Sequence, residues 1–454
     1  MIKKLFLIAA VSFTGTVFAQ NADSVFIKKM ADEILTHSTA YENLRYLTKK
    51  IGGRLAGSPK MVEAENWGYQ LLQKTGADKT YKQECMVPHW VRGGKDETII
   101  TIGNTKKSLT NLSIGNTIGS GKKGISSKVI LINNFDELEK RKDEIKGNIV
   151  FYNYKFNPTF VRTFEAYGDA GKYRGQGPAK ASALGAVGVI VRSMSHSTDN
   201  HAHTGGTNYK DTDKQIPAVA IGLQDADWLA AQFDKKAPIK AWIKTNGYFL
   251  PDTIGHNIIG ELKGTKYPNE IITVGAHLDS WDICEGAHDD GAGIVQTVEI
   301  LRTLKALGYK PNRTIRFVLF ANEENGMRGA VKYAEEAVAA KNEKHIFGLE
   351  SDAGGFTPRG FSVDAKAYDK VLTWAHLLAP YGANEIVKGG GGADVGPLQR
   401  MAGAAVGQLL PDSQRYFDIH HSTSDVFENV NKREMDLGAV NMAALIYLID
   451  QHGL

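Results

Sequence analysis

The second half of this chain alternates between short apolar runs and longer amphipathic segments, and no other feature limits its possible folds as strongly. The apolar runs are typical of strands buried in the middle of a sheet, and they cover residues 271–275, 314–321, 345–352 and 404–409. The segments between them are predicted helices, at residues 291–307, 327–341 and 365–378. This alternation predicts an α/β fold, with a largely parallel, twisted sheet flanked by helices on both faces.

The first half begins with two helical segments and then changes in texture. Helices are predicted at residues 23–50 and 60–75. Further on, short strands and helices mix with long loops rich in Gly, His and Thr, which indicates a separate, smaller α/β unit. We therefore expect one main domain in two pieces, 20–106 and 248–454, interrupted by an inserted domain at 107–247.

The N-terminus has the pattern of a secretory signal peptide. Lys3 and Lys4 precede an apolar run at residues 5–18, and small residues mark a cleavage point after Ala19. The run is too short to span a bilayer and is interrupted by hydroxyl side chains, and no second long apolar stretch follows. The pattern predicts that residues 1–19 are removed. It also predicts a secreted or periplasmic protein without membrane insertion after signal cleavage.

Charge and cysteine content exclude several classes of protein. The formal charge is only +4 over 454 residues, with no dense basic stripe, so we expect no nucleic-acid partner. The two cysteines, Cys85 and Cys284, form neither a disulfide-rich scaffold nor a C-x-x-C metal motif. Export would permit a disulfide between them, but the sequence does not show that they meet. Any metal ligands must therefore come from His and carboxylate side chains.

Acidic residues and histidines gather where the predicted strands end. They are His277, Asp279, Asp289, Asp290, Glu323, Glu324, Asp352, His420 and His421. Functional residues collect at the carboxyl ends of parallel strands, and so many buried charges are costly unless cations compensate them. Imidazole and carboxylate without thiolate favour zinc in a hydrolytic site, although cobalt or manganese would also fit. A pair of metal ions would share a bridging carboxylate.

Five short motifs give these residues a family resemblance. They are His277-x-Asp279, Asp289-Asp290-Gly291-Ala292-Gly293, Asn322-Glu323-Glu324, Ser351-Asp352 and His421-Ser422. The series resembles the co-catalytic zinc exopeptidases. With Arg54-Leu55-Ala56-Gly57-Ser58 near the N-terminus, it is most similar to their carboxypeptidase Q branch, also called plasma glutamate carboxypeptidase. The similarity extends over nearly all of the mature chain.

The resemblance implies a role for each site residue. Two Zn²⁺ ions would be held by His277 and Asp352 on one side and by Glu324 and His421 on the other, with Asp289 bridging. Glu323 would be the general base, and Asp279 would orient His277.

For other residues the implied roles are less direct. His420, Asp394 and His203 are expected to contact substrate. The insert resembles a protease-associated domain, and its loop at 196–206 is expected to overhang the cleft rather than to bind a third metal. The resemblance also implies a homodimer.

The function that the sequence predicts is an exported zinc exopeptidase acting on dipeptides or short peptides. An aminopeptidase acting on longer peptides is the alternative, because nothing in the bare sequence says which terminus is recognised. A non-catalytic, receptor-like binding protein and a single-zinc cyclising enzyme are disfavoured, because every ligand position and the base are present.

Overall fold

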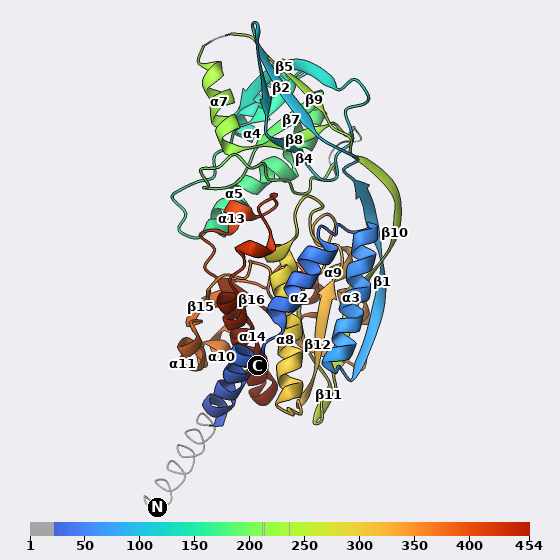
Figure 1. The fold of residues 1–454 in the computed structure, drawn as a ribbon, viewed down its shortest axis with the longest axis vertical. Helices are drawn as coiled ribbons and strands as arrows, with labels where there is room; N and C mark the ends of the chain where they lie inside the picture. Colours follow the sequence, from blue (N-terminus) through green and yellow to red (C-terminus); the bar gives the residue numbers. More distant parts are fainter. Residues whose placement is uncertain (1–21, 211, 213, 236) are drawn as a thin grey trace, which may run out of the picture.

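Two eight-stranded sheets, each flanked by helices, form the two parts of the molecule (Figure 1). The structure, a computed structural model, describes residues 22–454 apart from 211, 213 and 236. The predicted signal peptide at 1–19 lies outside the described residues. Within the described chain, no helix combines the length and apolar character needed to cross a bilayer.

The main sheet has a parallel centre and antiparallel edges. Its strand order is β1 (Lys79–Val91), β10 (Tyr248–Leu262), β12 (Arg313–Phe320), β11 (Tyr267–His277), β13 (Lys344–Glu350), β16 (Ala405–Pro411), β14 (Pro358–Val363) and β15 (Glu385–Lys388). The four central strands, β12, β11, β13 and β16, are parallel, whereas β1, β10 and β14 pair antiparallel with their neighbours towards the centre. The predicted α/β fold with a largely parallel sheet is confirmed for these central strands.

Helices cover both faces of the main sheet. On one face, α3 (Pro59–Thr75), α8 (Ala292–Ala306) and α14 (Lys432–His452) pack with the helical residues 22–37 in the larger core. On the other face lie α9 (Arg328–Ala339) and α12 (Gly396–Ala402). Alternate strand residues supply the two cores: Phe317 faces the first and Val318 the second.

The prediction of one continuous helix at 23–50 is wrong. Residues 22–37 are helical, α2 (Ala40–Tyr46) follows, and a π-helical turn at Leu47–Ile51 completes the segment. At the break, the Ser38 hydroxyl accepts a hydrogen bond from the Ala40 N–H, and Glu299 accepts one from the Thr39 N–H. Side chains that bond main-chain amides compete with the helical ladder, and the apolar spacing does not reveal this.

A second predicted helix is also divided. Residues 365–378 form α10 (Tyr368–Leu372) and α11 (Ala375–Leu378) instead of one continuous helix. By contrast, α3 begins within one residue of its predicted start, because the Ser58 side chain accepts a hydrogen bond from Met61 N–H and Pro59 opens the first turn.

The second sheet belongs to a chain segment inserted between β1 and β10. Its order is β3 (Thr105–Leu109), β2 (Glu97–Ile102), β9 (Ile239–Lys244), β5 (Ile125–Ile132), β6 (Ile149–Tyr152), β7 (Gly188–Arg192), β8 (Ala218–Ile221) and β4 (Asn111–Ser113). Its helices are α4 (Phe135–Lys140), α5 (Thr163–Gly175), α6 (Gly177–Ala183) and α7 (Leu223–Phe233). We call residues 97–244 the insert. Because β2 pairs with β9, the sheet starts at Glu97 and not after residue 107.

The insert and the main domain share part of their cores. Tyr416 and Phe417 of α13 (Tyr416–Ile419) are buried in the same apolar cluster as Tyr173 of α5. In Figure 1, α13 lies against α5, below the second sheet. The insert therefore packs directly on the chain segment that follows β16.

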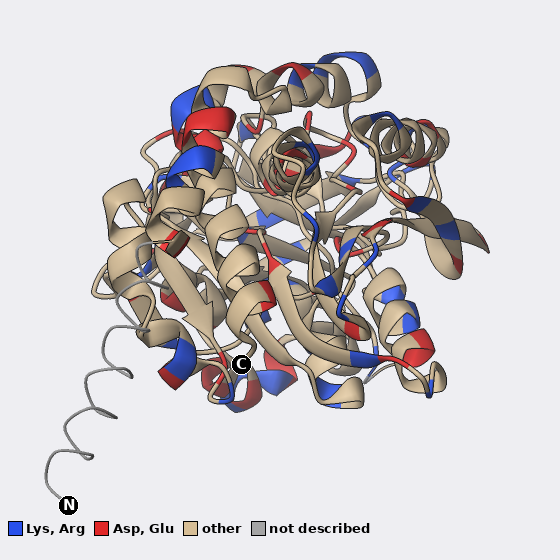
Figure 2. Ribbon diagram, turned by 90° about the horizontal axis from the view of Figure 1, so that it is seen from below, with Lys and Arg blue, Asp and Glu red and all other residues tan. Residues whose placement is uncertain are grey.

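Cys85 and Cys284 are both free thiols, so the disulfide that export would permit is not formed. Burial raises the pKa of the Cys85 thiol to about 12. Figure 2 shows Lys and Arg interspersed with Asp and Glu over the helices and loops visible from that side.

Candidate metal centre and active site

Three neighbouring strand ends bring the predicted site residues together. Strand β11 lies between β12 and β13, and all three run parallel. His277 is the last residue of β11, Glu323 and Glu324 follow β12, and Asp352 follows β13. Asp289 comes from the turn before α8, and His421 from the segment after α13. The sheet topology thus gathers residues that are up to 144 positions apart, from 277 to 421.

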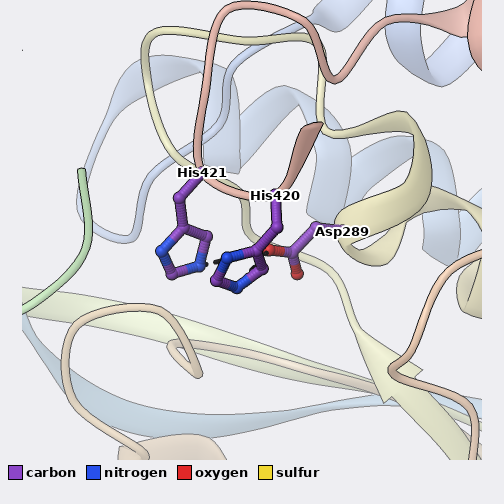
Figure 3. A group of neighbouring side chains, drawn as sticks. All are labelled: Asp289, His420 and His421. Carbon is purple, nitrogen blue, oxygen red and sulfur yellow. Dashed lines mark ion pairs between the residues drawn. The ribbon is translucent and has the colours of Figure 1, made fainter. Parts of the chain in front are cut away.

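Asp289 lies between two groups of potential ligands. Its Oδ1 is 3.2 Å from His277 Nε2, which is itself 3.5 Å from Asp352 Oδ1. Its Oδ2 is 3.2 Å from His421 Nε2, which is 3.0 Å from Glu324 Oε2. Figure 3 shows the His421 and His420 rings beside the Asp289 carboxylate. One carboxylate therefore presents one oxygen to each group.

Two buried oxygens of this cluster lack hydrogen bonds. Asp289 Oδ2 and Glu324 Oε2 have no hydrogen-bond partner among the described residues. Buried carboxylate oxygens are nearly always satisfied in proteins, by hydrogen bonds or by a metal ion. Nitrogen and carboxylate oxygen donors without thiolate match the ligand set of zinc in hydrolytic sites. The residues present therefore fit a zinc centre.

The electrostatics of the cluster also favour cations. Burial, reinforced by the neighbouring Asp289, raises the pKa of Glu324 to about 7. Although burial opposes it, Asp289 and Asp352 raise the pKa of His277 well above its ordinary value. Glu324 and Asp289 act in the same way on His421. Without metal, the cluster must therefore take up protons to offset its negative charge.

Asp279 supports the site differently from the prediction. Its carboxylate accepts hydrogen bonds from the main-chain N–H groups of Glu323, at 3.0 Å, and Glu324, at 3.3 Å. His277 Nδ1 lies 3.1 Å from the main-chain oxygen of Asp279 but 3.8 Å from its carboxylate. A contact between the two side chains needs an extended chain through residue 279, so that both project to the same side, whereas β11 ends at His277. The side chain of Asp279 is thus free to hold the loop that carries both glutamates.

Asp290 also lies close to His277 and Asp352, and the three could hold one ion. Both of its oxygens, however, accept main-chain hydrogen bonds, one from His277 N–H at 3.2 Å and one from Gly293 N–H at 3.1 Å. Asp289 Oδ2, by contrast, accepts no hydrogen bond from the described residues. Of the two adjacent acids, Asp289 is therefore the one suited to bridging. The peptide bond between them is cis.

Asp425 is a further acidic residue of the site, beyond those predicted from the sequence. Its carboxylate accepts hydrogen bonds from the N–H groups of His288, at 2.7 Å, and Asp289, at 3.2 Å. Burial raises the pKa of Asp425 to about 7. Its position four residues after His421, in the same polar segment, was the available signal.

The three residues expected to contact substrate are all buried. His420 stacks on His421 with ring centroids 3.6 Å apart, and its Nε2 is 3.6 Å from Asp289 Oδ2. Asp394 is 1% exposed, and neither of its carboxylate oxygens has a hydrogen-bond partner among the described residues. Burial and the nearby Glu350 raise its pKa well above the ordinary value. In the part of the chain that the structure describes, neither ring nitrogen of His203, from the insert, has a partner, and burial lowers its pKa to about 4.

A buried cluster of imidazoles and carboxylates at the carboxyl edge of a mostly parallel sheet is the kind of site that metal-dependent hydrolases have. Residues 257–446 match peptidase family M28. The chain is 33% identical to carboxypeptidase Q of Homo sapiens, over 90% of this chain and 85% of that protein. It is also 33% identical to carboxypeptidase Q of Xenopus laevis, over 93% and 89%. The chain belongs to peptidase family M28 and is a zinc-dependent metallopeptidase.

Solved structures agree with this assignment. A peptidase M28 precursor from Shewanella amazonensis SB2B superimposes with a TM-score of 0.88 at 30% identity, covering 95% of this chain and 97% of that one. A zinc aminopeptidase from Bacillus subtilis shares the fold, with a TM-score of 0.64 at 20% identity and coverage of 90% and 94%.

Proposed function

We propose that this protein is an exported exopeptidase with two zinc ions, which hydrolyses dipeptides or other short peptides in the manner that the name carboxypeptidase Q suggests. The observation that carries the proposal is the placement of Asp289, whose two oxygens face two separate His-carboxylate groups. The signal peptide predicted at 1–19 supports export.

In this proposal His277 and Asp352 would hold one zinc, and Glu324 and His421 would hold the other. Asp289 would serve both. Bound zinc would supply Lewis acidity, which lowers the pKa of a water molecule and polarises the peptide carbonyl. The remaining chemistry belongs to the side chains around it.

Glu323 is the general base in this mechanism. It is partly buried and its main-chain N–H is fixed by the Asp279 carboxylate at 3.0 Å. Burial raises its pKa well above the ordinary value, and the negative charges of Asp352 and Glu324 add to this effect. A carboxylate of raised pKa is a better proton acceptor near neutral pH. It would take the proton of the attacking water and return it to the leaving amine.

The substitution Glu323→Gln tests this role. We expect the variant to fold and bind zinc as the wild type does, while kcat for dipeptide hydrolysis falls about 10²–10⁴-fold, because the amide cannot accept the proton. Glu335→Gln, at an exposed position on α9, is the matched control and should retain full activity. Near-normal turnover by Glu323→Gln would contradict the assignment.

The protein could recognise either the free carboxylate or the free ammonium group of a peptide, depending on which of these charged groups its side chains bind. The name of the relatives supports a carboxypeptidase. The unpartnered, buried carboxylate of Asp394, together with the unpartnered Glu350 Oε1, instead favours an aminopeptidase, because acids bind a free ammonium group. Rates on a free dipeptide, its N-acetyl form and its C-terminal amide separate the two. Loss of activity on the amide alone indicates the carboxypeptidase, and loss on the N-acetyl form alone indicates the aminopeptidase.

A further inference from the structure

The insert contacts one of the two candidate histidine ligands directly. The Thr204 N–H donates a hydrogen bond to the main-chain oxygen of His421 at 2.9 Å. In the opposite sense, the main-chain oxygen of Thr204 lies 3.3 Å from His421 Nδ1. The loop of the insert therefore touches both the backbone and the ring of His421.

The carbonyl group of Thr204 is held in place by Arg174 of α5. Arg174 Nη1 donates to the Thr204 oxygen at 3.1 Å, and Nη2 donates to the Tyr167 hydroxyl. The guanidinium carbon lies 5.3 Å from the centroid of the Tyr167 ring. The guanidinium also packs on Gly205, where a Cβ atom would come within 2.3 Å of that carbon and where φ is +138°. Glycine is required there for both reasons.

Contact with the Thr204 carbonyl determines which nitrogen of His421 is available to a metal. A carbonyl oxygen only accepts hydrogen bonds, so Nδ1 must carry the ring proton for the contact to be favourable. The lone pair is then on Nε2, the atom that faces Asp289 at 3.2 Å and Glu324 at 3.0 Å. Partners of this kind orient histidine ligands and raise their basicity.

The two histidines differ in the origin of this partner. His277 Nδ1 lies 3.1 Å from the main-chain oxygen of Asp279, two residues away in the same domain. His421 instead depends on a carbonyl 217 positions away, in the insert. A disturbance of the insert should therefore affect one metal site and spare the other.

We propose that Arg174 is a positioning residue of the metal centre: through the carbonyl group of Thr204 it holds His421 in the orientation that presents Nε2 to the second zinc. The insert then orients a metal ligand in addition to packing beside the metal centre. This inference rests on the proposed function only in requiring that His421 binds zinc.

The substitution Arg174→Met tests the inference by zinc titration of the full chain against a chromophoric chelator. The wild type should bind two equivalents. In the variant, we expect one equivalent to bind more weakly and the other to be unchanged. The weakening should reach at most about 10–100-fold, the effect of losing the histidine's partner altogether. Activity at limiting zinc should fall and should recover with excess zinc. Arg174→Lys, which keeps one donor, should lie between the two.

Arg141→Met is the matched control. Arg141 also lies in the insert and its Nη1 donates to a main-chain oxygen, that of Leu131 at 2.8 Å, away from the main domain. Arg174→Met binding both equivalents as tightly as Arg141→Met would overturn the inference. If circular dichroism shows that Arg174→Met does not fold, Tyr167→Phe, which removes an acceptor of Arg174, is titrated instead. Weakening of one equivalent supports the inference and unchanged binding overturns it.

The wild-type titration separates this inference from the proposed function. Fewer than two equivalents in the wild type would contradict the proposed two-zinc function itself. Two equivalents in the wild type, with no difference between the Arg174 and Arg141 variants, would contradict only the role of Arg174.

Discussion

Arg54 is the one fully buried arginine of the described chain, and its side chain bonds to main-chain oxygens instead of to a carboxylate. It donates to Leu278 at 2.5 Å, Glu285 at 2.9 Å and Gly286 at 3.1 Å. These oxygens lie at both ends of the loop that joins His277 to the turn of Asp289. Burial lowers the pKa of Arg54, and the nearby acids Asp425 and Asp279 oppose that shift. Through Arg54, the Arg-Leu-Ala-Gly-Ser motif therefore stabilises the loop that leads from His277 to Asp289.

Loss of this side chain should be costly. Arg54→Met leaves several buried main-chain oxygens without donors, and we expect the free energy of unfolding of the metal-free protein to fall by about 2–4 kcal/mol. Urea unfolding measures it. Arg359→Met, where the side chain is 55% exposed, should change the same quantity by less than about 0.5 kcal/mol. Equal stabilities of the two variants would contradict the role given to Arg54.

At the residue scale, the sequence identified side chains better than it identified their contacts. All five residues that the resemblance implied as ligands come together, because their motifs follow neighbouring strand ends. The partners of Asp279 and the role of Asp425 were not predictable, because both depend on where a loop turns after its strand. The same is true of the approach of Thr204 to His421, which joins two separate domains.

At the scale of elements, the close approach of the first turn of α8 to Ser351, the residue that follows β13, positions Asp289. An added Cβ at Gly293, in the first turn of α8, would lie 2.0 Å from the main-chain oxygen of Ser351 and 2.5 Å from Asp290 Oδ1. The contact with Ser351 is not possible without movement of the backbone, and the contact with Asp290 would displace its carboxylate. The second glycine of Asp289-Asp290-Gly291-Ala292-Gly293 is therefore required by the fold, whatever the chemistry.

Because of this close contact, substitution of Gly293 should destabilise the protein. We expect Gly293→Ala to lower the free energy of unfolding by about 2–3 kcal/mol or more, because α8 must move away from the main chain at Ser351. Gly171→Ala is the matched control. It lies within α5, where an added Cβ meets nothing within 4 Å, and it should stabilise the protein by about 0.5–1 kcal/mol. Thermal unfolding compares the two, and a tolerated Gly293→Ala would contradict the account of this packing.

The elements that could be predicted are those with the strongest apolar signal. Strands β11, β12, β13 and β16 are buried on both faces, and their apolar runs reveal them. The paired strands β1 and β10 lie at one edge of the main sheet, and in their exposed parts the pattern carries no such run. Breaks within helices, as at Ser38, depend on single hydrogen bonds and leave no trace in periodicity.

At the scale of the whole molecule, the arrangement of the insert is the feature that sequence could not supply. The composition indicated a separate unit, but not that α5 would share an apolar cluster with α13. That docking depends on side chains from segments far apart in the sequence, such as Phe164, which lies 5.4 Å from Tyr416 between ring centroids. It brings Thr204 to His421 and so links the two domains at the site.

Zinc titration of Asp289→Asn tests the proposal that Asp289 is shared by two zinc ions. The wild type should bind two equivalents tightly. Glu324→Gln should retain only the equivalent held by His277 and Asp352. Asp289→Asn should weaken both equivalents, because the amide offers neither site a charged oxygen. Tight binding of either equivalent by Asp289→Asn, at the wild-type affinity, would contradict the account.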